Sequence, residues 1–147
     1  MGTSAKKQNI TKIIWIDPNI DSEKNEYYLK ELKKLKNKLI SPFKDIESAL
    51  KFIKKLIFSK TYIIISGSLY NDFIEQFKKN LKKIFIIPKI IIFTSNKERF
   101  LDNNKNYNDN YNSFYNVGGI QTSFKDIKNF VSKPLPINKK IQLKKVN

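Results

Sequence analysis

Residues 62–68 read Tyr-Ile-Ile-Ile-Ser-Gly-Ser, and the expected architecture follows from this stretch together with two similar ones. Its first four side chains are mainly apolar, which is typical of a strand buried on both faces of a parallel sheet. The hydroxyl and glycine residues that follow predict a turn at the carboxyl end of that strand. Two more apolar runs, 13–16 and 90–93, also end in polar residues. The sequence therefore predicts three central strands, each ending in a polar turn.

Amphipathic helices are predicted between these strands, because apolar residues recur there every three or four positions among lysines. Ser, Asp and Asn residues stand where such helices would begin, and their side chains can cap the first free backbone N–H groups. The candidate helix starts are Asp21 or Ser22, Asp45, Ser68 or Asn71, the segment 97–101, and Ser123 with Asp126 at capping-box spacing.

Strands and helices alternate at the spacing of βαβ units, so we expect a parallel sheet covered by helices on both faces. Two weaker strands complete it, at 117–120 and at 40–43, where Pro42 restricts the strand to an edge. In the order 2-1-3-4-5 the three most apolar strands lie in the centre, where both faces are buried. We predict an α/β protein, a three-layer flavodoxin-like sandwich around a five-stranded parallel sheet.

A chain of 147 residues has room for one domain with a single core. The strand and helix pattern covers 12–131. Residues 1–11 are interpreted as a disordered N-terminus or the remnant of a tag, and 132–147 as a basic tail or linker. The segment 102–116 is rich in Asn and Tyr, which predicts a long exposed loop. The alternative is a recognition surface formed by Tyr107, Tyr111 and Tyr115.

The residue types that are missing exclude several classes of chemistry. The chain has no Cys and no His, so it has no disulfide, no thiolate or imidazole group, and no Cys or His metal ligand. A metal would have to bind through carboxylates and carbonyls, which suits Mg²⁺ or Ca²⁺. We expect no cofactor, with Mg²⁺ as the alternative.

The net charge of +16 comes from 29 Lys and Arg against 13 Asp and Glu. Such a charge suggests nucleic acid or an anionic membrane as a partner. Arg99 is the only arginine, however, and proteins that bind phosphate or read bases usually rely on the arginine fork. Lys, Asn and Ile all have A/T-rich codons, so a biased genome would raise all three together. We interpret most of the charge as compositional, and nucleic acid as a partner that is not favoured.

The N-terminus has no apolar stretch long enough for a signal peptide. The longest nearly apolar run, 84–93, contains Pro88 and Lys89 and is too short to span a bilayer. We expect a cytoplasmic protein without a membrane span, with the nucleus as an alternative.

Candidate site residues stand at the strand ends, because the crevice of an open α/β sheet forms beyond the carboxyl ends of its strands. Each also has a simpler structural role: Asp17 as a strand stop, and the other residues as a turn or a helix cap. The 66–68 turn could direct N–H groups at a phosphate, although it lacks the lysine of a P-loop. The candidate crevice comprises Asp17, Ser66, Gly67, Ser68, Thr94 and Ser95.

This strand pattern resembles the receiver domain of response regulators, the CheY-like family, over about 12–131. In that family acidic residues end the first strand, a phosphate-accepting Asp the third, Thr or Ser the fourth, and Lys the fifth. Asp17 and Thr94 match two of these positions, but Ser66 stands where the phosphate-accepting Asp is expected, and 118–122 contains no Lys. The resemblance implies a degenerate pseudo-receiver, which keeps the scaffold without the phosphoryl-transfer chemistry.

The resemblance further implies a non-catalytic interaction module of an intracellular signalling protein, which binds a protein partner or a fused effector domain and could form a homodimer. Two alternatives stay open: an electrostatic binder of nucleic acid or anionic lipid through the lysine surface, and a small enzyme that binds Mg²⁺ or a nucleotide in the strand-end crevice. Receivers bind partners through the face of their fourth helix, fifth strand and fifth helix. The corresponding residues here are Glu98, Leu101, Phe114, Tyr115, Phe124 and Ile127.

Overall fold

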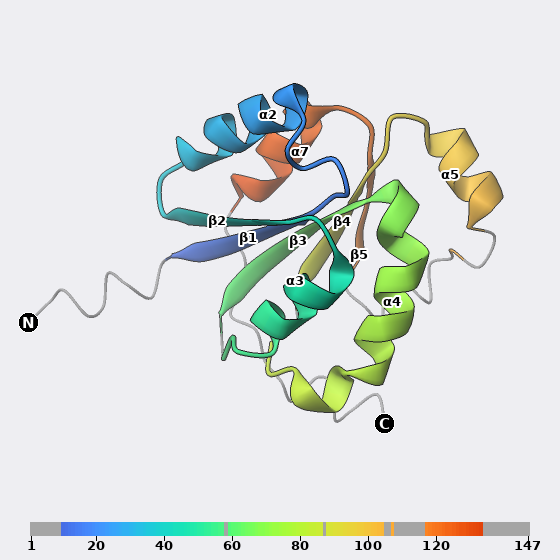
Figure 1. Cartoon of the computed structure of the whole chain (residues 1–147). Coiled ribbons are helices and arrows are strands. Elements are labelled where there is room, and N and C mark those ends of the chain that lie inside the picture. Colours follow the sequence, from blue (N-terminus) through green and yellow to red (C-terminus); the bar gives the residue numbers. More distant parts are fainter. Residues whose placement is uncertain (1–9, 58, 87, 105–106, 108–116, 134–147) are drawn as a thin grey trace, which may run out of the picture.

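A five-stranded parallel sheet forms the centre of the molecule (Figure 1). The computed structural model describes residues 10–57, 59–86, 88–104, 107 and 117–133. The strand order is β2-β1-β3-β4-β5, and every neighbouring pair is parallel. This confirms the predicted flavodoxin-like sandwich. The strands are β1 (Thr11–Ile16), β2 (Lys38–Phe43), β3 (Lys60–Ser66), β4 (Lys89–Phe93) and β5 (Val117–Gln121).

Helices cover both faces of the sheet and make the two outer layers (Figure 1). Helices α2 and α7 lie on one face, and α3 and α4 on the other; α5 packs on the α4 side through Phe100. The described residues contain no helix that is both long and apolar enough to cross a membrane. The helices are α2 (Glu23–Lys33), α3 (Ile46–Ile53), α4 (Tyr70–Lys79), α5 (Lys97–Asn103) and α7 (Phe124–Val131), with short 3₁₀ turns η1 (Gly67–Leu69) and η2 (Leu81–Lys83).

The central strands divide their side chains between two cores. In β1, Ile14 and Ile16 face the core under α3 and α4, whereas Ile13 and Trp15 face the core under α2 and α7. All four side chains are fully buried. The alternation follows from strand geometry, in which successive side chains point to opposite faces. A continuous apolar run is therefore required wherever helices cover both faces, which is why β1, β3 and β4 could be recognised in the sequence.

Side-chain caps start four of the helices. Ser22 caps α2, Asp45 caps α3, Asn96 caps α5 and Ser123 caps α7, each accepting a hydrogen bond from the backbone N–H three residues later. The Ser48 N–H bond also lowers the pKa of the Asp45 carboxyl. The predicted cap at Asp45 is confirmed. The predicted start of the third helix at Ser68 or Asn71 is wrong, because the 3₁₀ turn η1 leads directly into α4 without a side-chain cap.

The edge strand β2 carries a proline on its open side. The backbone N–H groups of Thr11 and Asp17 donate to the carbonyls of Asn37 and Phe43, so the odd-numbered residues of this segment bond to β1. Pro42 belongs to the alternate set, whose backbone groups face away from the sheet, and its missing N–H therefore removes no bond to β1. A proline at this position limits pairing of the exposed edge with another strand.

The segment predicted as an exposed loop, 102–116, contributes to the fold at its start. Helix α5 continues to Asn103, and Tyr107 is partly buried against Tyr70 and Phe100, with ring centroids 5.8 and 5.6 Å apart. The rest of the segment from 108 to 116, with Tyr111 and Tyr115, lies outside the described residues. Tyr107 was therefore assigned to the wrong environment, because a composition rich in Asn and Tyr does not distinguish a core tyrosine from a surface one.

The described secondary structure runs from Thr11 to Val131. Strand β1 begins at Thr11, one residue before the predicted start, and Thr11 is buried. Helix α7 ends at Val131, and the next two residues remain attached to the domain, because the Lys133 carbonyl accepts a hydrogen bond from the Tyr62 hydroxyl. The basic tail beyond Lys133 lies outside the described residues.

Replacing Tyr62 by Phe should lower the free energy of unfolding by about 1–2 kcal/mol. The buried Tyr62 hydroxyl lies 3.2 Å from the Phe130 carbonyl and 3.0 Å from the Lys133 carbonyl, and it joins β3 to the end of α7. Burial also raises the pKa of Tyr62, which keeps the donating hydroxyl protonated. Urea unfolding, followed by Trp15 fluorescence, measures the loss. Tyr27→Phe is the control, because Tyr27 is 60% exposed, and an equal effect of the two substitutions would contradict the anchoring role of Tyr62.

Candidate functional site

Three of the predicted site residues stand at the carboxyl ends of strands, at the same edge of the sheet. Ile16 at the end of β1 pairs with Ile65 of β3, and Ser66 pairs with Phe93 at the end of β4. Ser66 therefore lies on the middle strand, with Asp17 after β1 on one side and Thr94 after β4 on the other, and neighbouring strands are about 4.8 Å apart. The register places them where an open parallel sheet forms its crevice.

The carboxylate of Asp17 stabilises the turn that follows β1. One of its oxygens accepts a hydrogen bond of 2.8 Å from the Asn19 backbone N–H, and the other accepts one of 3.4 Å from the Asn25 side chain. The Asn25 amide also donates to the Asn19 carbonyl at 2.8 Å, which ties α2 to the turn. Asp17 is thus held by an Asx turn and by the first turns of α2.

The turn after β3 packs closely against the turn after β4. The hydroxyl oxygens of Ser66 and Ser68 lie 3.1 Å apart and share a hydrogen bond. Between them, Gly67 approaches the next turn so closely that an added Cβ would lie 3.0 Å from the Thr94 Cβ and 3.2 Å from the Phe100 ring. A side chain at this position would be crowded, and the Thr94 or Phe100 side chain would have to shift by a few tenths of an ångström to admit it.

Thr94 joins β5 and α5 to the end of β4. Its backbone N–H donates to the Gln121 carbonyl at 3.1 Å, and its hydroxyl oxygen lies 3.4 Å from the Asn96 N–H, which donates to it. The Asn96 side chain then accepts a hydrogen bond from the Arg99 backbone N–H at 3.0 Å and caps α5. The predicted helix-cap role of 94–96 is confirmed, with Asn96 as the cap.

A cavity of about 560 Å³ lies between the η1 turn and α5. Four of the six predicted crevice residues line this cavity, whereas Asp17 and Ser66 do not. The remaining wall comes from α4 and α5 and was missed by sequence reasoning, although Asn96, Arg99 and Asn103 follow helical spacing on one face. The residues that line it are Gly67, Ser68, Asn71, Thr94, Ser95, Asn96, Arg99, Phe100, Asn103 and Asn104.

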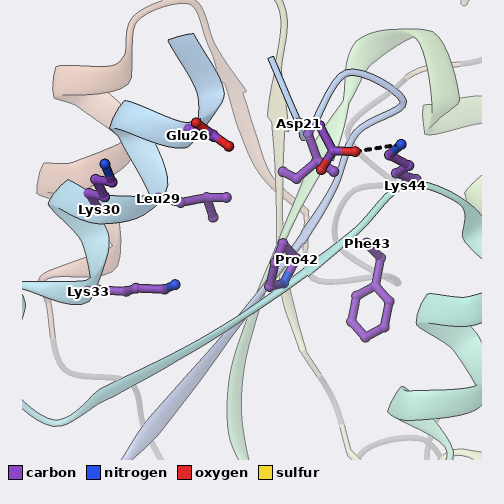
Figure 2. Close-up of a pocket in the computed structure, with 9 residues that line it drawn as sticks. Asp21, Glu26, Leu29, Lys30, Lys33, Pro42, Phe43 and Lys44 are labelled. Atoms are coloured by element: carbon purple, nitrogen blue, oxygen red, sulfur yellow. Dashed lines mark ion pairs between the residues drawn. The ribbon is translucent and has the colours of Figure 1, made fainter. Parts of the chain in front are cut away.

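A second cavity, of about 550 Å³, lies between α2 and the edge strand β2 (Figure 2). Figure 2 shows the α2 side chains on one wall and the end of β2 on the other, with the Asp21 carboxylate paired to Lys44 at the rim. Acidic and basic side chains both line this cavity. Asp21, the acidic residue nearest to Asp17 in sequence, forms an ion pair with Lys44. The lining residues are Ile20, Asp21, Glu26, Leu29, Lys30, Lys33, Pro42, Phe43 and Lys44.

Within the described residues, no three acidic side chains gather as a group that could hold a metal ion. Asp17 supplies one carboxylate at the edge of the sheet, and each of its oxygens accepts one hydrogen bond, from the Asn19 backbone N–H or from the Asn25 side chain. The polar groups that the structure does bring together at this edge are hydroxyls and amides, with the Arg99 guanidinium. Such groups suit hydrogen bonding to a polar or anionic ligand better than coordination of Mg²⁺.

The residues of the candidate partner face differ in their exposure. Glu98 is exposed on α5, and Leu101 is 37% exposed there. Phe124 is half-buried and stacks on Tyr28 with ring centroids 4.1 Å apart. Ile127 is fully buried in the core under α2 and α7, so its side chain offers no contact to a partner. Phe114 and Tyr115 lie outside the described residues.

Comparisons with known proteins add no assignment: no family model matches the chain, and no match is found among curated proteins.

Proposed function

We propose that this protein is a receiver-like domain that has lost phosphoryl transfer and serves as a non-catalytic protein-interaction module of an intracellular signalling protein. The observation that carries the proposal is the position of Ser66 at the end of β3. This serine lies beside Asp17, where a receiver would hold its phosphate-accepting carboxylate, and its hydroxyl is bonded to that of Ser68. The flavodoxin-like strand order supports the comparison with receivers.

The polar groups at this edge support a structural role over a catalytic one. A serine hydroxyl needs a neighbouring base to become a nucleophile, and the chain has no His. The hydroxyl bonded to Ser66 is another serine, and the carboxylate of Asp17 bonds to Asn19 and Asn25. On this proposal the module requires no cofactor.

The α5 surface supports an interaction role for the scaffold. Phe100 is the one buried residue of α5, while Glu98 and Leu101 face solvent. In such a contact Leu101 would supply apolar area and the charged residues around it a polar rim. On this proposal a cytoplasmic protein partner, a fused effector domain or a second copy of the chain binds there.

Ser66→Asp tests whether the scaffold is receiver-like. The new carboxylate would stand beside Asp17 at the end of the neighbouring strand. Repulsion between two like charges on adjacent strands should lower the melting temperature in the absence of Mg²⁺. Added Mg²⁺ should restore it, because two adjacent carboxylates form the beginning of an oxygen-ligand site. Thermal unfolding with and without Mg²⁺ measures both effects.

Ser66→Asn is the matched control, since the amide has nearly the size of the carboxylate but no charge. We expect neither Ser66→Asn nor the wild type to respond to Mg²⁺. A failure of Ser66→Asp to respond would contradict the receiver-like arrangement of the two strand ends. Phosphorylation of the wild type by acetyl phosphate and Mg²⁺, detected by intact-protein mass spectrometry, would contradict the non-catalytic assignment.

A further inference from the structure

We propose that the cavity between the η1 turn and α5 binds a small phosphorylated metabolite, with Arg99 holding the phosphate and the surrounding amides and hydroxyls holding the polar body. This site goes beyond the proposed function and does not depend on it. Its volume of about 560 Å³ lies within the usual range for small-ligand pockets.

Arg99 carries the charge of this cavity. Of the side chains that line it within the described residues, Arg99 alone is ionised at neutral pH, and no carboxylate lies among them. No described carboxylate forms an ion pair with its guanidinium, whereas Lys34, Lys44, Lys51 and Lys128 each have an acidic partner. The guanidinium is therefore available to an oxyanion, for which its planar fork is well suited.

The position of this arginine is informative because the composition favours lysine everywhere else. The chain contains 28 lysines and one arginine, and the arginine lines a cavity whose wall contains no lysine. Lysine would supply the same charge but could not form two parallel hydrogen bonds to one phosphate. A bidentate contact explains why the guanidinium stands at this position.

Amide and hydroxyl groups form most of the rest of the wall, together with Gly67 and Phe100. Within the described part of the chain, no hydrogen bond engages the side-chain amide of Asn71 or Asn103, and Ser95 adds a hydroxyl. The Asn104 amide donates to the Phe100 carbonyl at 2.8 Å, which leaves its oxygen as an acceptor. Each free amide can both donate and accept, so the wall matches the hydroxyl groups of a sugar or a similar polar body.

The first test follows the Arg99 side chain by NMR. Because the chain has one arginine, the ¹H–¹⁵N spectrum of the labelled protein contains a single arginine Nε–H signal, and Arg99→Lys identifies it by removing it. Ribose 5-phosphate is the probe, with inorganic phosphate and ribose as separate arms. All titrations are made at constant ionic strength, since diffuse binding to the lysine surface is screened by salt.

We expect ribose 5-phosphate to move the Arg99 signal in a saturable way, inorganic phosphate to move it with weaker affinity, and ribose to leave it unchanged. Arg99→Gln should weaken binding of ribose 5-phosphate about tenfold or more, because a charge-assisted contact is lost. Thermal shift measures this variant, and Trp15 fluorescence confirms that it is folded. Asn103→Ala should weaken ribose 5-phosphate but not inorganic phosphate.

Lys97→Gln is the matched control, because Lys97 stands on the same helix with the same charge but does not line the cavity. Equal weakening by Lys97→Gln and Arg99→Gln would overturn the proposal in favour of diffuse attraction. An unmoved Arg99 signal with both phosphate probes would also overturn it. Equal affinity for inorganic phosphate and ribose 5-phosphate would overturn the role given to the amides. None of these outcomes bears on the Ser66→Asp test, which concerns the ends of β1 and β3.

Discussion

Replacing Trp15 by Ala should lower the free energy of unfolding by about 3–5 kcal/mol. Trp15 is the largest fully buried side chain, and it contacts Tyr28, Phe93 and Phe124 with ring centroids 6.0–6.5 Å away. These rings come from α2, β4 and α7, so the loss of the indole leaves a cavity where three elements meet. Because the stability of a small domain is about 5–15 kcal/mol, a large part of it would be lost.

Trp15→Phe separates the apolar contribution of the indole from that of its N–H group. The Nε1 atom is buried and has no hydrogen-bond partner among the described residues, which is an unfavourable environment for a donor. Phe removes that donor while it keeps an aromatic ring, so we expect a loss of only about 1–2 kcal/mol.

Both Trp15 variants lack the fluorescent side chain, and the unfolding free energies are therefore measured by circular dichroism in urea. Equal losses in Trp15→Phe and Trp15→Ala would contradict the expectation that another aromatic ring retains most of the packing at this position. A small effect of Trp15→Ala would contradict the position of Trp15 between α2 and α7.

The fold could be predicted because strands that are buried on both faces of the sheet appear in the sequence as continuous apolar runs. Strands β1, β3 and β4 must be apolar at every central position, and their polar neighbours mark where the sheet ends. Strand β5 was a weaker prediction since it contains two glycines, and its register with β4 shifts between Ile90 and Ile92. Gly119 has a φ of 112°, a conformation that glycine adopts readily and other residues do not.

The candidate site was only partly predictable, because one wall is formed by strand ends and the other by a helix whose position depends on tertiary packing. Strand ends can be located from local sequence, and Ser68, Thr94 and Ser95 do lie together in one cavity. The opposite wall depends on where α5 packs, which is set by the contact of Phe100 with Tyr70 and Tyr107. Such tertiary contacts have no local signature.

Ile64→Ala should lower the free energy of unfolding by about 3–4 kcal/mol. Ile64 lies in the central strand β3, is fully buried, and faces the core under α2 and α7. Its neighbours in the sheet, Trp15 on β1 and Ile91 on β4, are fully buried as well. Because strands flank it on both sides and helices cover it, the surrounding structure has little freedom to close the cavity.

Ile40→Ala is the matched comparison, since it removes the same atoms from the same face of the sheet. Ile40 lies in the edge strand β2, packs against the same core, and is only half-buried. We expect a loss of about 1 kcal/mol, because less apolar surface is buried and the open edge can adjust. The two free energies, measured by urea unfolding with Trp15 fluorescence, test the strand order itself. Equal losses would require β2 to be as enclosed as β3, which a position at the edge of the 2-1-3-4-5 sheet does not allow.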